Sequence, residues 1–144
     1  MNNLSVIILA GGKGKRMNAK KYNKVTYPVA GKPIITRILE KLTAANFTDI
    51  IVVVGHAKNS VTSLLPQTVK IAHQTRRLGT GHATKSAITQ IPASSQNVLV
   101  LYGDDAFWYN PENFQELINK LRDGNKRYWE NKRKEKSQIM EEIK

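Results

Sequence analysis

The 144-residue chain contains no cysteine and no long hydrophobic run, and it carries few acidic residues. Without cysteine it forms neither disulfides nor thiolate metal sites, and a cysteine nucleophile is excluded as well. None of its apolar runs approaches the ~20 residues that a membrane-spanning helix needs. The opening residues, MNN, also lack the basic start and the cleavage site of a signal peptide. We therefore expect a cytoplasmic protein without a membrane partner.

The scarcity of acidic residues leaves 11 carboxylates against 23 lysines and arginines, a net charge of +12. Eight basic residues precede the first carboxylate, Glu40, so the excess is concentrated near the N-terminus. A field of this sign attracts polyanions, which include both small phosphates and nucleic acid. A generally basic surface without any ligand explains the overall excess equally well.

The most informative stretch runs from Leu4 to Met17, where the apolar segment SVIILA continues into GGKGKRM. Glycine allows positive φ and a close approach of the backbone to a ligand. Successive N–H groups then form a concave anion site, to which the interleaved cations add charge. Neither common phosphate motif fits, because Leu9 and Arg16 break a Walker A loop and Met17 breaks the dinucleotide pattern. The stretch predicts a strand followed by a phosphate-binding turn; a turn without a ligand is the alternative.

Short apolar runs alternate with helical periodicity along the rest of the chain. Strands are predicted at Leu4–Ala10, 50–54, 69–72 and 98–102, helices at 33–46, 59–65, 81–91 and 111–122, and a polar loop region at 13–31. This alternation predicts an α/β fold, Rossmann-like, with a mainly parallel sheet and helices on both faces. Ligands bind beyond the carboxyl ends of such strands. We expect residues 1–123 to form the nucleotide-binding part and the charged residues 124–144 a helical or flexible tail.

Five stretches of the chain resemble the sugar-1-phosphate nucleotidyltransferases. They are LAGGKGKRM at 9–17, NKVTYPVAGKPII at 23–35, VVVGH at 52–56, QTRRLGTGHA at 74–83 and VLVLYGDD at 98–105. The nearest branch is the uridylyltransferase (pyrophosphorylase) domain of bifunctional N-acetylglucosamine-1-phosphate uridyltransferase. The resemblance covers about residues 4–120, the N-terminal part of that domain, and implies the nucleotide-diphospho-sugar transferase fold in truncated form.

The resemblance implies an enzyme of UDP-sugar biosynthesis for cell-wall precursors. Such an enzyme transfers UMP from UTP to a sugar-1-phosphate such as N-acetylglucosamine-1-phosphate, releases pyrophosphate and uses Mg²⁺. Arg16 and Lys24 would act in catalysis by stabilising the phosphates, and Asp104 would hold the metal. Gln74 would read the uracil edge. The implied nucleotide-binding residues are Leu9, Ala10, Gly11, Gly12, Lys13, Gly14, Gln74, Gly79, Thr80, Tyr102 and Gly103.

Two departures from the family pattern keep alternatives open. Tyr22-Asn23-Lys24 stands where the family usually has L-P-K, and nothing in 124–144 resembles the part of the domain that contacts the sugar and supplies a second metal ligand. One alternative is a non-catalytic nucleotide-binding pseudoenzyme or fragment that acts through a partner or a homo-oligomer. Another is a basic nucleic-acid-binding module that uses residues 13–24 and 126–136. Transfer to another sugar or alcohol phosphate, or guanylyl transfer to the molybdenum cofactor, is a third.

Overall fold

The computed structural model describes residues 4–14 and 21–122. The chain divides into two compact units, residues 1–111 and residues 112–144, which are described separately. Arg16 and the predicted tail at 124–144 lie outside the described residues. Within the described residues, no helix is both long enough and apolar enough to cross a bilayer.

The first unit is built on four parallel strands, as the alternating sequence pattern predicted. They are β1 (Leu4–Ala10), β4 (Ile50–Val54), β5 (Lys70–His73) and β6 (Asn97–Tyr102). Their order in the sheet is β5-β4-β1-β6, so β1 pairs with both β4 and β6. All five residues of β4 are buried, which explains its uninterrupted run of isoleucine and valine. Because the strands are parallel, all four carboxyl ends lie at one edge of the sheet.

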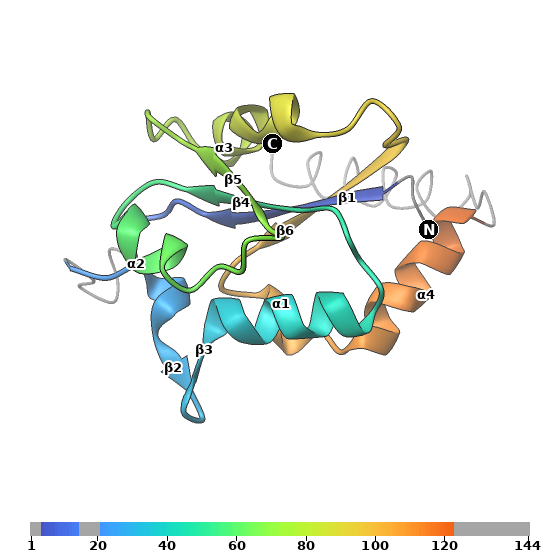
Figure 1. The fold of residues 1–144 in the computed structure, drawn as a ribbon, viewed down its shortest axis with the longest axis horizontal. Coiled ribbons are helices and arrows are strands. Elements are labelled where there is room, and N and C mark those ends of the chain that lie inside the picture. Colours follow the sequence, from blue (N-terminus) through green and yellow to red (C-terminus); the bar gives the residue numbers. More distant parts are fainter. Residues whose placement is uncertain (1–3, 15–20, 123–144) are drawn as a thin grey trace, which may run out of the picture. The chain divides into compact units, whose positions relative to one another are not determined.

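Helices cover the two faces of this sheet. Helix α1 (Ile34–Ala44) and helix α3 (Thr80–Ala87) lie on opposite sides of it in Figure 1. Under α3, Ala83 and Ala87 pack in one apolar cluster with Ile7 of β1 and with strands β4 and β5. The small alanine side chains let the helix approach the strands closely. Helix α1 buries the stripe that its spacing predicted, which comprises Ile34, Ile35, Ile38, Leu39 and Leu42.

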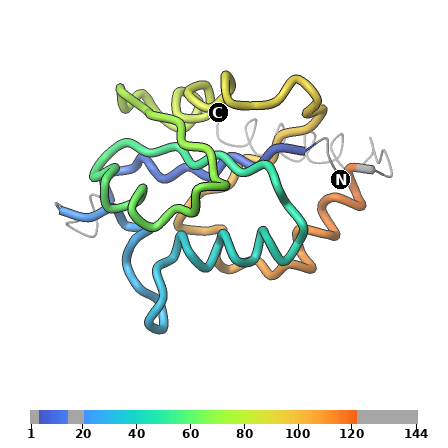
Figure 2. Tube along the Cα trace, viewed as in Figure 1, coloured from blue at the N-terminus to red at the C-terminus, as the bar shows by residue number. Residues whose placement is uncertain are grey.

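The predicted loop region at 13–31 contains more structure than the sequence indicated. A 3₁₀ turn, η2 (Lys24–Thr26), is followed by a hairpin of β2 (Pro28–Val29) and β3 (Lys32–Pro33). Ala30 and Gly31, with φ of 48° and 76°, make the two-residue turn that such hairpins favour. Figure 2 shows the hairpin projecting away from the four-stranded sheet. Pro33 therefore ends a strand and precedes α1 instead of starting it.

Two other predicted helices differ from their predicted bounds by a few residues. The predicted helix at 59–65 is α2 (Lys58–Thr62), and the one at 81–91 is α3 followed by η3 (Ile88–Gln90). A further 3₁₀ turn, η4 (Ala106–Trp108), follows β6. In the second unit, α4 (Pro111–Arg122) has the predicted bounds.

A polar cluster connects the amino ends of the strands, at the edge opposite the carboxyl ends. The Ser5 hydroxyl is fully buried and donates to Asp49, and it shares a hydrogen bond with Ser95. Lys70 Nζ donates to the other Asp49 oxygen at 2.6 Å. Asp49 thus joins β1 and β5 through a carboxylate that is only 20% exposed.

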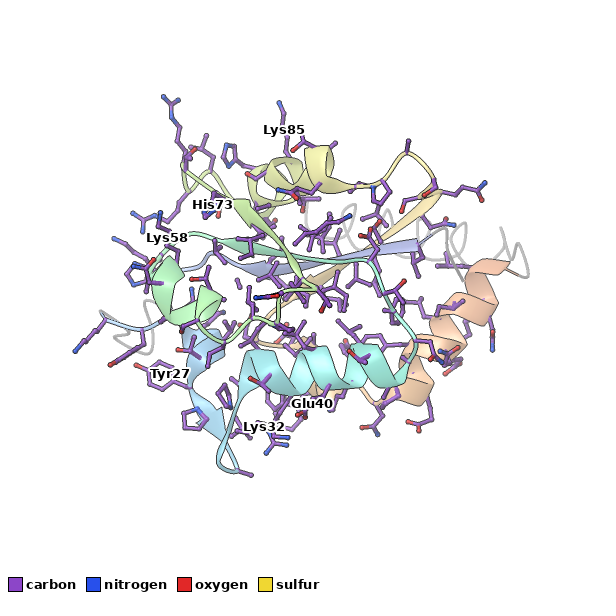
Figure 3. The ribbon with its side chains drawn as sticks, viewed as in Figure 1. Tyr27, Lys32, Glu40, Lys58, His73 and Lys85 are labelled. Atoms are coloured by element: carbon purple, nitrogen blue, oxygen red, sulfur yellow. The ribbon has the colours of Figure 1, made fainter. Side chains whose placement is uncertain are left out.

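We expect Asp49→Ala to lower the free energy of unfolding by about 1–3 kcal/mol, because the buried Ser5 hydroxyl and Lys70 lose a charged partner. Glu40→Ala is the matched control. Glu40 pairs with Lys32 at 2.8 Å, but both side chains are about half exposed, and Figure 3 labels them at the surface. Exposed pairs contribute at most about 1 kcal/mol. Urea denaturation of both variants tests this difference, and equal losses would contradict it.

Candidate active site

A cleft of about 680 Å³ lies over the carboxyl ends of β1 and β6. Leu9 and Tyr102, which are register partners in these two strands, both line it, and Thr80 and Ala83 line it from α3. Strands β4 and β5 lie on one side of β1 in the sheet, and β6, which comes later in the chain, lies on the other side. The cleft therefore lies where the strand order reverses, which is the usual ligand site of an open α/β sheet.

Most of the predicted site residues meet at this cleft. Those that line it are Leu9, Gly11, Gly12, Lys13, Lys24, Gln74, Gly79, Thr80, Tyr102 and Asp104. Ala10, Gly14 and Gly103 are not among the lining residues, and Arg16 lies outside the described residues. Ala10 is buried at the end of β1, and Gly103 supports the cleft through its backbone.

The turn after β1 is packed closely against the turns that follow its neighbours. The His56 N–H donates to Gly11 O at 3.2 Å, and the Gly103 N–H donates to Leu9 O at 3.0 Å. A Cβ added at Gly55 would lie 2.9 Å from Gly11 O, and one at Gly103 would lie 2.9 Å from Leu9 O. Only glycine fits at such distances from a backbone oxygen. The three turns thus form one contiguous rim.

Lys24 and Asp104 form an ion pair at the rim of the cleft. Lys24 begins η2, whereas Asp104 follows β6, so the pair joins segments that are 80 residues apart. Their side chains are 26% and 40% exposed, which leaves the carboxylate accessible from the cleft. The pair places a cation and a carboxylate in the same cleft as the glycine turn (residues 11–14, after β1).

Gln74 is held in place by its neighbours on both sides. Its N–H donates to Val54 O at 2.8 Å, and its side-chain Nε2 donates to Gly79 O at 3.2 Å. Oε1, the hydrogen-bond acceptor of the carboxamide, lies beside Gly11, where an added Cβ would be 2.7 Å from it. The carboxamide therefore spans the space between the glycine turn and the start of α3.

Two carboxylates line the described part of the cleft, Asp104 and Asp105. Among the described residues, no group of three or more histidine, aspartate, glutamate or cysteine side chains is arranged to hold a metal. One or two carboxylates still fit Mg²⁺, which commonly completes its shell with water and substrate phosphates. The donor set suits a metal that arrives with a nucleotide better than a permanent protein-bound metal.

The MobA-like NTP transferase domain family matches residues 6–137 of this chain. The chain belongs to this family. The predicted nucleotidyltransferase relationship and the predicted fold are thereby confirmed.

Relatives of this NTP transferase domain agree with the assignment. The bifunctional protein GlmU of Pseudothermotoga lettingae is 52% identical over 99 residues, which are 68% of this chain and 21% of that protein. The chain spans about a fifth of the length of the curated relatives it matches. A putative glucose-1-phosphate thymidylyltransferase from Bacillus anthracis superimposes with a TM-score of 0.62 at 26% identity, over 81% of this chain and 51% of that one.

A more distant solved structure shows the same fold. The 4-diphosphocytidyl-2C-methyl-D-erythritol synthase of Anaerococcus prevotii superimposes with a TM-score of 0.65 at 19% identity. The matched part covers 83% of this chain and 51% of that chain. The nucleotide-diphospho-sugar transferase fold therefore extends over most of the present chain.

Three residues that line the cleft of this domain, Arg77, Ala83 and Asp105, were not among the predicted site residues. Arg77 lies in the loop between β5 and α3, three residues after Gln74. The signal that could have identified it was its position, because loops that leave the carboxyl ends of parallel strands line the ligand site. Ala83 belongs to the buried face of α3, which is a packing position, so no chemical signal marks it.

Proposed function

We propose that this chain binds UTP in the cleft and transfers UMP to a sugar-1-phosphate such as N-acetylglucosamine-1-phosphate. An oxygen of the sugar phosphate attacks the α-phosphorus of UTP, the bond between that phosphorus and the bridging oxygen to the β-phosphate breaks, and pyrophosphate leaves. The observation that carries the proposal is the convergence of Gln74, the glycine turn and the Lys24–Asp104 pair in one cleft.

In this proposal some residues of the cleft bind the phosphates of UTP and others bind its base. The N–H groups around Gly11 and Gly12 bind the phosphates, and Lys13 and Lys24 neutralise their charge. Gln74 Oε1 accepts a hydrogen bond from the N3–H of uracil, while its Nε2 stays bonded to Gly79. Arg16 has its catalytic role by resemblance to the family. Mechanistically, the protein contributes mostly position and charge.

Asp104 is the residue that we propose to hold Mg²⁺, with Asp105 adjacent to it. When bound, Mg²⁺ supplies positive charge that polarises the phosphate oxygens and stabilises the leaving pyrophosphate. Lys24 forms an ion pair with Asp104. With Mg²⁺ held at the Asp104 carboxylate, the ammonium of Lys24 would be available to bind a phosphate oxygen.

Base selectivity tests the role of Gln74. With Mg²⁺ present, we expect UTP to bind more tightly than GTP, CTP or ATP, and Gln74→Ala to reduce the preference for UTP by about 3- to 10-fold, the equivalent of one hydrogen bond. Gln90→Ala is the matched control, because Gln90 also donates to a backbone carbonyl, Ile71 O, but does not line the cleft. Isothermal titration calorimetry measures all four affinities, and equal affinity for them would contradict the role of Gln74.

Turnover is a separate question from binding. Incubation with UTP, N-acetylglucosamine-1-phosphate and Mg²⁺ should release pyrophosphate at a rate that depends on both substrates. Tight UTP binding without pyrophosphate release would instead identify a non-catalytic nucleotide-binding protein. Failure to bind any nucleoside triphosphate would contradict the proposed function altogether.

A further inference from the structure

Asn23 is the most extensively hydrogen-bonded buried polar side chain among the described residues of the cleft region. It is 1% exposed. Its Nδ2 donates to Ala10 O at 2.7 Å, to His56 O at 3.0 Å and to Gly12 O at 3.3 Å. Its Oδ1 accepts from the Val25 N–H at 3.2 Å, which caps η2. Three carbonyl oxygens around one atom require that atom to be the amide nitrogen.

The three carbonyls belong to the turns that border the cleft. Ala10 and Gly12 flank the glycine turn after β1, and His56 follows Gly55 after β4. Asn23 does not line the cleft itself, whereas Gly11, Gly12 and Lys13 do. It therefore binds the turn from behind. Carbonyl oxygens that are bonded to Asn23 are held away from an anion in the cleft, which they would otherwise repel.

The backbone of Asn23 links the glycine turn to two further segments, the start of α2 and the turn after β6. Its N–H donates to Ser60 Oγ at 3.1 Å, and Ser60 Oγ donates in turn to Ala57 O at 2.7 Å at the start of α2. The next residue is Lys24, whose ammonium reaches Asp104 beyond β6. The dipeptide Asn23-Lys24 thus joins the turns after β1, β4 and β6.

We propose that Asn23 is the positioning residue of the nucleotide site. It fixes the glycine turn against the turn after β4 and sets the direction from which Lys24 reaches the phosphates. The expected effect of Asn23 on nucleotide affinity rests on the proposed function. Its expected effect on the order of the glycine turn does not. The chemistry requires a primary amide, because aspartate would turn a carboxylate oxygen toward three carbonyl oxygens.

Two variants test the proposal. Asn23→Asp keeps the shape of the side chain and the acceptor for the Val25 N–H, but it places a negatively charged oxygen against the three carbonyl oxygens. Asn23→Ala, which removes the side chain, is the second variant and is used if Asn23→Asp does not fold. We expect either to weaken UTP binding, measured by calorimetry with Mg²⁺ well below the melting temperature, by about 10-fold or more, because displaced binding groups are costly. Amide hydrogen exchange should accelerate at residues 11–14 and 56.

Ser5→Ala is the control for a general loss of stability. Ser5 is also buried and hydrogen-bonded, but it lies at the opposite edge of the sheet. We expect it to lower the melting temperature while it leaves UTP affinity and exchange at 11–14 unchanged. A folded Asn23 variant with wild-type affinity and wild-type exchange at the turn would overturn the proposal. If wild-type protein binds no UTP but the variants still loosen the turn, the proposed function fails and the role of Asn23 in positioning the turn stands.

Discussion

Asp104→Asn is expected to lower the Mg²⁺-dependent affinity for UTP by about 100-fold or more. Loss of a residue that merely supports a metal ligand already costs about 10- to 100-fold in metal affinity, so loss of the ligand itself should cost at least as much. Asparagine retains the shape of the side chain and one hard oxygen, but it removes the charge that attracts Mg²⁺. The measurement is a UTP titration at several Mg²⁺ concentrations.

The same substitution should have the opposite effect when Mg²⁺ is removed with a chelator. The carboxylate of Asp104 then repels the triphosphate and keeps Lys24 occupied in the ion pair. Without this charge, Lys24 is free to bind phosphate, so UTP should bind the variant at least as tightly as the wild type. This change of sign distinguishes a metal ligand from a residue that merely maintains the fold.

Asp105→Asn provides the matched control for the neighbouring carboxylate. Asp105 lines the same cleft, so its replacement by asparagine removes the same charge as Asp104→Asn. The two positions differ in that Asp104, and not Asp105, is the proposed metal ligand and the partner of Lys24. We expect a smaller loss of Mg²⁺-dependent affinity for Asp105→Asn than for Asp104→Asn. Equal losses in the two variants would mean that the cleft attracts Mg²⁺ through its overall charge, and the assignment of the ligand to Asp104 would be wrong.

The fold could be predicted from the sequence because its signals are local. The buried run in β4 and the apolar spacing of α1 each specify their element without reference to the rest of the chain, and both were found within a few residues of the predicted bounds. The alternation of such elements then predicts the parallel sheet. The rim of the cleft followed from this topology, since the carboxyl ends of parallel strands meet at one edge.

What the sequence did not reveal depends on contacts between distant segments. The Lys24–Asp104 pair joins residues 80 positions apart, and no local pattern indicates it. In the sequence, Asn23 was only a departure from the L-P-K pattern. In the structure, its side chain donates hydrogen bonds to Ala10 O, before the turn after β1, and to His56 O, in the turn after β4. The hairpin at 28–33 was missed because each of its strands is two residues long, too short for a periodic signal.

Gly55→Ala is expected to disturb both stability and the nucleotide site, because the alanine Cβ would meet backbone. It would lie 2.9 Å from Gly11 O and 3.1 Å from Gly11 Cα, and neither atom belongs to a flexible side chain. The glycine turn would have to move, and the bond from the His56 N–H to Gly11 O would be strained. Overpacking of this kind costs about 1–3 kcal/mol. We therefore expect the variant to show a lower free energy of unfolding in urea and weaker UTP binding.

Gly81→Ala separates this steric effect from the general effect of replacing glycine. Gly81 lies in α3, and a Cβ there would meet nothing within 4 Å. In a helix, alanine is favoured over glycine by about 0.5–1 kcal/mol, so this variant should be as stable as the wild type or more stable. Opposite signs for the two variants would establish that contact with Gly11 limits position 55. If Gly55→Ala is instead as stable as Gly81→Ala and binds UTP normally, the turn after β1 is free to shift, and close packing against β4 does not define the phosphate site.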